Sequence, residues 1–115
     1  MIATNIEQSR HLAELIPHDS ADMTYEKLAI GNNFPEELQY RLCLTAFRFY
    51  SGIGVPAWSL SALLELIPCA DLVKLDSTWT CGSIIGRVEA DTPIEAACKM
   101  IVKLTENEQY IQRNG

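Results

Sequence analysis

The sequence lacks the motifs that identify most catalytic, metal-binding and nucleotide-binding domains. It contains no CxxC pair, no HExxH, and neither GxGxxG nor GxxxxGK[ST], the two glycine patterns that hold phosphate groups on backbone amides. The glycine-containing stretch 51–56 (SGIGVP) therefore predicts a flexible turn. We predict no catalytic residue, no metal ligand, no cofactor and no cofactor-binding residue.

Basic residues are scarce and scattered. The chain has 9 Lys and Arg against 15 Asp and Glu, which gives a net charge of -6. Because proteins bind phosphate backbones through clustered Lys and Arg, we expect no direct nucleic-acid binding. An acidic factor that occupies a nucleic-acid-binding protein stays open as a function, although mimicry of this kind favours denser acidic faces.

Long apolar runs are also missing. The first ten residues (MIATNIEQSR) contain no signal-peptide core, and no apolar stretch is long enough to span a bilayer. These absences predict a cytoplasmic protein without membrane association. The four cysteines lie in apolar surroundings, so we expect reduced, buried thiols, with Cys69 the most exposed. They are Cys43, Cys69, Cys81 and Cys98.

The chain does contain enough apolar material for one core. Its 115 residues are 48% hydrophobic and 21% charged, which is typical of a globular protein. The length predicts a single domain over residues 1–115, with a polar tail that frays at about 108–115.

The stretch 56–68 (PAWSLSALLELIP) predicts a short buried helix over about 59–67. Ser59 has the side chain of a helix cap, and Pro68 cannot supply the amide that another turn needs. Trp58 and Leu63 have the spacing of a hydrophobic staple, in which two apolar side chains hold the entering chain against the first turn. We expect the other elements to pack around this helix.

The N-terminal part predicts a helix over about 4–16, ended by Pro17. Two alternative pairs have capping-box spacing: Thr4 with Glu7, and Asn5 with Gln8. Two strands are predicted after this helix. Residues 23–28 favour a short edge strand, and residues 40–50 fit a helix or a strand, with the strand favoured by aromatic and β-branched content.

Residues 71–88 predict a β-hairpin turning at Asp76-Ser77-Thr78. In this register Val73 and Leu75 share a face with Trp79 and Cys81, and together they form a floor for the helices. Two glycines mark a bulge or a second bend: Gly82 and Gly86.

The last predicted helix covers about 93–107. Thr92, Pro93 and Glu95 supply the cap, the first-turn proline and the returning carboxylate of a capping box. The polar stripe of this helix is narrow, so it should be covered on more than one side. The stripe consists of Glu95, Lys99 and Lys103.

Either the N-terminal helix or a second copy of the chain can cover the remaining apolar side of this helix. The N-terminal helix has a small apolar face, so we predict a homodimer with Met100 and Val102 at the interface. The fold class predicted from all segments is α+β. A small antiparallel sheet packs with the helices at 59–67 and 93–107, and the N-terminal helix lies at the periphery.

Three segments also carry a resemblance: 20–23 (SADM), 56–68 (PAWSLSALLELIP) and 90–97 (ADTPIEAA), the last two separated by a hairpin containing Trp79. They resemble small uncharacterised proteins of Bacteroides-type bacteria, their phages and mobile elements. The chain is similar, more weakly, to phage helix-sheet-helix sandwich domains. The resemblance implies shared architecture and an origin in phages or mobile elements, and it implies no activity.

The function predicted from these observations is a non-catalytic intracellular protein-interaction module with an unknown protein partner. A small enzyme with a carboxylate or thiol site is the alternative. Its candidate groups are the carboxylates of Asp76, Glu89 and Asp91, and the Cys69 thiol with His11 or His18 as base. A metal site built from His11, Glu14 and His18 is disfavoured because Pro17 ends the helix between the two histidines.

Overall fold

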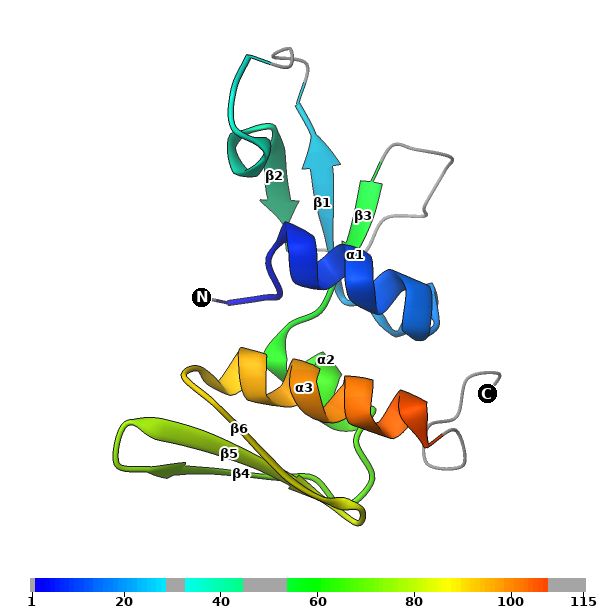
Figure 1. The fold of residues 1–115 in the computed structure, drawn as a ribbon. Coiled ribbons are helices and arrows are strands. Elements are labelled where there is room, and N and C mark those ends of the chain that lie inside the picture. Colours follow the sequence, from blue (N-terminus) through cyan, green and yellow to red (C-terminus); the bar gives the residue numbers. More distant parts are fainter. Residues whose placement is uncertain (1, 29–32, 45–53, 108–115) are drawn as a thin grey trace.

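A computed structural model of the protein describes residues 2–28, 33–44 and 54–107 (Figure 1). It confirms the predicted α+β class and shows two small antiparallel sheets. The helices are α1 (Ile6–Leu15), α2 (Leu60–Glu65) and α3 (Pro93–Glu106). The strands are β1 (Met23–Lys27), β2 (Tyr40–Cys43), β3 (Gly54–Ala57), β4 (Asp71–Leu75), β5 (Thr78–Ser83) and β6 (Gly86–Ala90). Two short 3-10 helices are η1 (His18–Ser20) and η2 (Glu36–Leu38).

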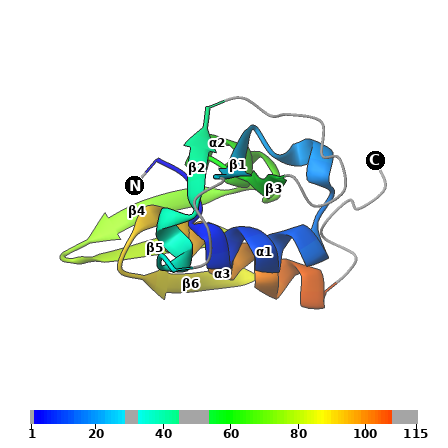
Figure 2. The ribbon, with the colours of Figure 1, turned by 90° about the horizontal axis from the view of Figure 1, so that it is seen from above.

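The two sheets lie on opposite sides of a helical layer (Figure 1). The first sheet has the strand order β2-β1-β3, and the second has the order β4-β5-β6. Helix α3 covers one face of the second sheet, while α1 lies between α3 and the first sheet. Seen from above, α1 and α3 run side by side (Figure 2).

The predicted peripheral position of the N-terminal helix is wrong. Helix α1 packs against both β3 and α3, and its Leu12 side chain is only 1% exposed. Asn5 rather than Thr4 caps the helix, because the Asn5 side chain accepts from the Gln8 amide and the Gln8 side chain accepts from the Asn5 amide. Thr4 is thereby left to turn inward, where it is fully buried.

The first sheet also differs from the prediction. Strand β1 was expected at an edge, yet it is central, because β3 pairs with it on the side opposite β2. Residues 54–56, which were expected in a flexible turn, form β3 together with Ala57. Pro56 has no amide to donate, which an edge strand tolerates. The predicted strand over 40–50 is present at 40–43, and residues 45–53 lie outside the described part.

Trp58 joins the first sheet to the helical layer. Its side chain is fully buried, and its indole Nε1 donates to Ser20 Oγ at 3.0 Å. Its backbone amide donates to Thr4 Oγ1 at 3.1 Å, and its carbonyl accepts from the Thr4 amide at 2.9 Å. Two further hydroxyls complete this joint: Ser9 Oγ lies 2.7 Å from Thr4 Oγ1, and the Tyr25 hydroxyl donates to the Thr4 carbonyl at 2.7 Å.

Helix α2 begins where the sequence predicts. Ser59 Oγ accepts from the Ala62 amide at 3.2 Å, and the Ser59 amide itself donates to Asp22 Oδ1 at 2.8 Å. Leu63 and Trp58 are both fully buried in one apolar cluster. The helix packs chiefly against α3, whereas the prediction placed it directly on a sheet.

The predicted register of the second sheet is wrong by one residue. A two-residue turn, Asp76 and Ser77, connects β4 to β5, so that Leu75 lies opposite Thr78 and Lys74 opposite Trp79. A one-residue shift moves every side chain to the other face of a sheet. Val73 and Leu75 therefore lie on the outer face, 40% and 61% exposed, while Leu72, Trp79 and Cys81 face α3.

The two glycines of this sheet have different functions. Gly86 follows the second turn and has a φ of 134°, which confirms a bend at this position. Gly82 lies in regular strand rather than in a bulge. Arg87 and Asp71 form a two-pronged ion pair across it, at 3.0 and 2.9 Å. A Cβ atom at position 82 would lie 2.6 Å from Asp71 Oδ1, so only glycine leaves room for this geometry.

Helix α3 begins at the predicted cap, where Thr92 Oγ1 accepts from the Glu95 amide at 3.1 Å and Pro93 occupies the first turn. The second sheet, α2 and α1 cover it within one chain. Met100 is fully buried, so it is not available to a second copy, and Val102 is half-buried beside α1. We predicted the homodimer from the apolar surface of α3. Elements of the same chain, including the N-terminal helix α1, cover this surface instead.

Candidate functional site

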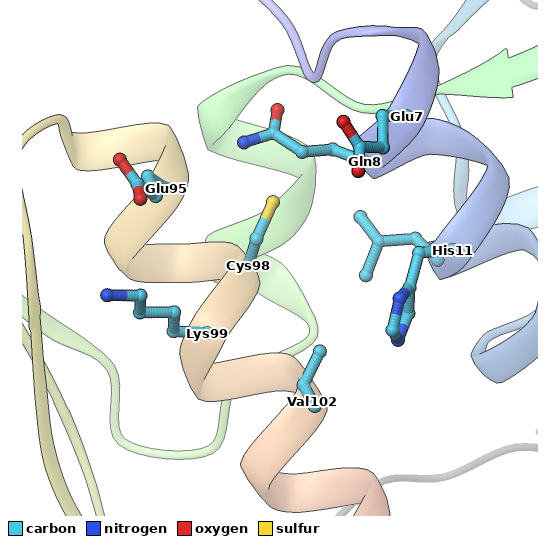
Figure 3. Close-up of a pocket in the computed structure, with 8 residues that line it drawn as sticks. Glu7, Gln8, His11, Glu95, Cys98, Lys99 and Val102 are labelled. Carbon is cyan, nitrogen blue, oxygen red and sulfur yellow. The ribbon is translucent and has the colours of Figure 1, made fainter.

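A groove of about 350 Å³ runs between α1 and α3 (Figure 3). The two helices start at the same end of the groove and run in the same direction (Figure 1). Each helix contributes one stripe of side chains, because residues three and four apart lie on the same helix face. The lining residues are Glu7, Gln8, His11 and Leu12 from α1, and Glu95, Cys98, Lys99 and Val102 from α3.

The floor of the groove is apolar. Leu12 and Cys98 are 1% and 8% exposed, and Val102 is half-buried between the two helices. Burial, with a smaller contribution from the negative charge of Glu95, raises the pKa of the Cys98 thiol to about 12. A thiol acts as a nucleophile or a metal ligand in its deprotonated form, so Cys98 contributes a small neutral surface at physiological pH.

The rim of the groove is acidic at one end. Glu7 lies in the first turn of α1 and Glu95 in the first turn of α3, and Figure 3 shows both near the same end of the groove, with His11 further along. The capping box holds Gln8 in place, since Gln8 Oε1 accepts from the Asn5 amide at 2.9 Å. The side chains at this end therefore present fixed polar atoms and two carboxylates.

Lys99 does not neutralise this acidic end. Its Nζ atom donates to the Glu89 carbonyl at 3.0 Å, and Figure 3 shows its amine directed away from α1. The side chain therefore belongs to the border between α3 and β6, although its stem forms part of the groove wall. The charge that the groove offers to a ligand is predominantly negative.

The other predicted candidates for chemistry are spread over the molecule. Asp76 lies in the β4–β5 turn, Glu89 on the outer face of the second sheet and Asp91 immediately before α3, all exposed. Cys69 is exposed after α2, as the sequence predicts. The structure brings none of these four residues to the groove.

His18, at the start of η1, and Asp22, shortly after it, make structural contacts. His18 Nε2 lies 2.9 Å from the Ala13 carbonyl, and Asp22 binds the amide and hydroxyl of Ser59. Within residues 2–28, 33–44 and 54–107, no three His, Cys, Asp or Glu side chains form a group that could hold a metal ion. In the same residues no helix is long and apolar enough to cross a membrane.

Comparison with known proteins assigns no family. No protein-family model matches the sequence, no curated protein matches it, and no solved structure matches it.

The sequence did not reveal the groove. Glu7, His11 and Lys99 are ordinary surface residues of two separate helices, and Cys98 was expected simply in the core. The sequence pattern that could have indicated a groove is a polar residue close to a buried one on each helix: Glu7 and Leu12 on α1, and Glu95 and Cys98 on α3. Such stripes become a site only when the tertiary fold places the helices side by side.

Proposed function

We propose that this chain is a non-catalytic protein-interaction module, and that its α1–α3 groove receives an apolar side chain from a basic segment of a partner protein. The observation that supports this function is the combination of an apolar floor with an acidic end. Leu12, Cys98 and Val102 offer no charged group, while Glu7 and Glu95 stand beside them.

The size of the groove supports anchoring by a side chain. A volume of about 350 Å³ is close to the lower limit of small-molecule pockets, which span about 300–1,000 Å³. Protein segments commonly bind such grooves by inserting one or two large apolar residues from a helix or an extended stretch. The floor would exclude water from the anchor and so supply the main favourable contribution to binding.

The charge of the groove supports a basic partner. Glu7 and Glu95 face the same end, and the chain as a whole carries a net charge of -6. Complementary charge accelerates encounter and excludes acidic competitors, while adding modestly to affinity. Lys or Arg beside the anchor would meet the two carboxylates.

Binding is favoured over catalysis at this site by the state of its thiol. The raised pKa of Cys98 keeps the sulfur protonated at neutral pH, and a thiol enzyme requires the opposite shift. The origin in a phage or mobile element and the cytoplasmic location rest on the resemblance and on composition. The homodimer also stays a prediction, and it requires a surface other than α3.

Affinity capture from a lysate of the cells that produce the protein tests the proposal. Four forms serve as bait: the unmodified chain, Val102→Glu, Glu7→Lys and the control Glu65→Lys, which changes an exposed carboxylate on α2. We expect a specific protein that Val102→Glu loses, that Glu7→Lys binds weakly, and that Glu65→Lys retains. The captured protein should contain a segment with basic residues flanking a large apolar one.

Two results would contradict the proposal. One is a captured protein that all four baits retain equally, because the groove would then play no part. The other is a small molecule, rather than a protein, whose binding is lost with Val102→Glu. Circular dichroism of each variant establishes that the fold is preserved.

A further inference from the structure

The second sheet has two edge strands, β4 and β6, and within the described residues each pairs only with β5. An edge strand presents unpaired amides and carbonyls, which a further strand can bind. The two edges of this sheet differ in whether those groups are covered.

Helix α3 covers the β6 edge. Ser83 and Gly86 flank a two-residue turn, so the backbone groups of Arg87 and Glu89 point outward by alternation. The Glu89 carbonyl accepts from Lys99 Nζ at 3.0 Å. The Lys99 side chain thus occupies part of the space that another strand would need.

The β4 edge carries no such cover from α3. Leu75 and Thr78 flank the other two-residue turn, so alternation directs the backbone groups of Leu72 and Lys74 outward. The Lys74 amine lies 5.8 Å from the centre of the Trp79 ring, back over its own sheet. The Lys74 side chain therefore does not cover the edge, and among the described residues no helix packs along it.

The sequence of β4 is compatible with itself in an antiparallel pair. With a two-fold axis through Val73, Leu72 of one copy faces Lys74 of the other, and Asp71 faces Leu75. No like charges oppose each other, and Leu72 and Lys74 are both residues whose backbone groups point outward. The Asp71 carboxylate is already paired with Arg87, so it adds no uncompensated charge beside Leu75.

The outer face of β4 carries the apolar side chains that such pairing would bring together. Val73 and Leu75 are 40% and 61% exposed, although both are large and apolar. In the pair, the two Val73 side chains meet at the axis and the Leu75 side chains lie on either side of them. The apolar residues that the single chain leaves in water become a continuous stripe.

We propose that a second copy of this chain pairs antiparallel with the first along β4, centred on Val73, and that the two second sheets form one continuous sheet. This surface is separate from the α1–α3 groove. The proposal gives the predicted homodimer an interface different from Met100 and Val102.

A charge-swap experiment on the full chain tests this symmetry. Val73→Lys and Val73→Glu each place like charges at the two-fold axis, so each variant alone should be monomeric in analytical ultracentrifugation. The unmodified protein at micromolar concentration should be a dimer. An equal mixture of the two variants should restore the dimer, because Lys then faces Glu. Since Val73 is exposed, neither substitution disturbs the core.

Control variants separate this proposal from the groove. Ile84→Lys, on an exposed turn of the same sheet, should leave the dimer intact, and so should Val102→Glu in the groove. A monomeric unmodified protein would overturn the proposal. So would a dimer that persists in both Val73 variants, or a mixture that remains monomeric.

Discussion

The two three-stranded sheets of this protein have similar size but are held by different interactions. The first sheet is joined to the helices through hydroxyls and backbone groups around Thr4, Ser9, Tyr25 and Trp58. The second sheet is held by apolar packing between α3 and the inner face that contains Trp79 and Cys81. We call these regions the polar joint and the apolar layer.

This difference predicts how strongly a substitution in each region should destabilise the protein. In the apolar layer, truncation removes contacts roughly in proportion to volume, and neighbours can partly collapse into the gap. In the polar joint every group depends on another, and among the described residues no buried side-chain polar atom lacks a partner. Removing one hydroxyl there leaves its partners desolvated and unpaired, which is costly for its size.

Trp58→Ala should give the largest loss, because Trp58 belongs to both regions. Its ring fills the core and its indole and backbone groups complete the polar joint. We expect a loss of about 3–5 kcal/mol in the free energy of unfolding, measured by urea denaturation. Trp79→Ala, at a half-buried position, should lose less. The reverse order would show that the joint does not connect the two regions.

Thr4→Val compares the two regions directly. It keeps the shape of the side chain but removes the Thr4 hydroxyl, the partner of the Trp58 amide and the Ser9 hydroxyl. We expect the free energy of unfolding to fall by about 1–3 kcal/mol. The matched control is Thr80→Val in the second sheet. The Thr80 side chain is 6% exposed and lies on the same sheet face as Val73, where the added methyl group of valine contacts apolar surface, so the loss there should be smaller. Equal losses in urea melts would remove the distinction between the regions.

Alkaline pH should weaken the protein through the Cys98 thiol. Burial raises the pKa of this thiol from an ordinary value of 9.0 to about 12, so between these values the unfolded chain has lost a proton that the folded chain retains. The free energy of unfolding should then fall by roughly 1.4 kcal/mol per pH unit from this group. Burial also raises the pKa of Cys81 and Tyr25, which adds loss in the same direction.

Cys98→Ala identifies the contribution of this thiol to the pH profile. The variant should show a shallower decline in stability above about pH 9, the ordinary pKa of a thiol, with Cys81 and Tyr25 accounting for the remainder. An unchanged slope would mean that Cys98 is accessible to water in the groove.

Gly82→Ala should have the smallest effect. The new Cβ atom would displace the Asp71 carboxylate and break its pairing with Arg87, but that pair is exposed. Exposed ion pairs contribute about 0.2–1 kcal/mol, so a loss within that range is expected. In the Asp71→Ala background the same substitution should have almost no further effect. A loss of several kcal/mol would imply that backbone, rather than the carboxylate, opposes the added atom.

Local signals in the sequence were sufficient for the helix starts. Ser59 and Thr92 cap α2 and α3, since a capping side chain and the amides it serves lie within one turn. The α+β class was predictable for the same reason, because the periodicity of apolar residues is also a short-range signal. Short-range signals also explain why residues 40–43 form a strand and why Gly86 marks a bend.

Relations between distant segments were not predictable in the same way. The turn at Asp76 and Ser77 is one residue shorter than expected, which moved Val73 and Leu75 to the outer face. Strand β3 forms because β1 offers it an edge, although Gly54 and Pro56 favour no strand by themselves. The groove and the central position of α1 depend likewise on packing that no single segment encodes.

Site-specific photo-crosslinking tests the central claim, that the α1–α3 groove binds a partner protein, most directly. A photoreactive amino acid replaces His11, an exposed residue of the groove, in cells that produce the protein. The same amino acid replaces Ile84, an exposed residue on the far sheet, as the control. The account predicts a covalent adduct with another protein from position 11 and none with that protein from position 84. No protein adduct from position 11, or the same adduct from both positions, would contradict it.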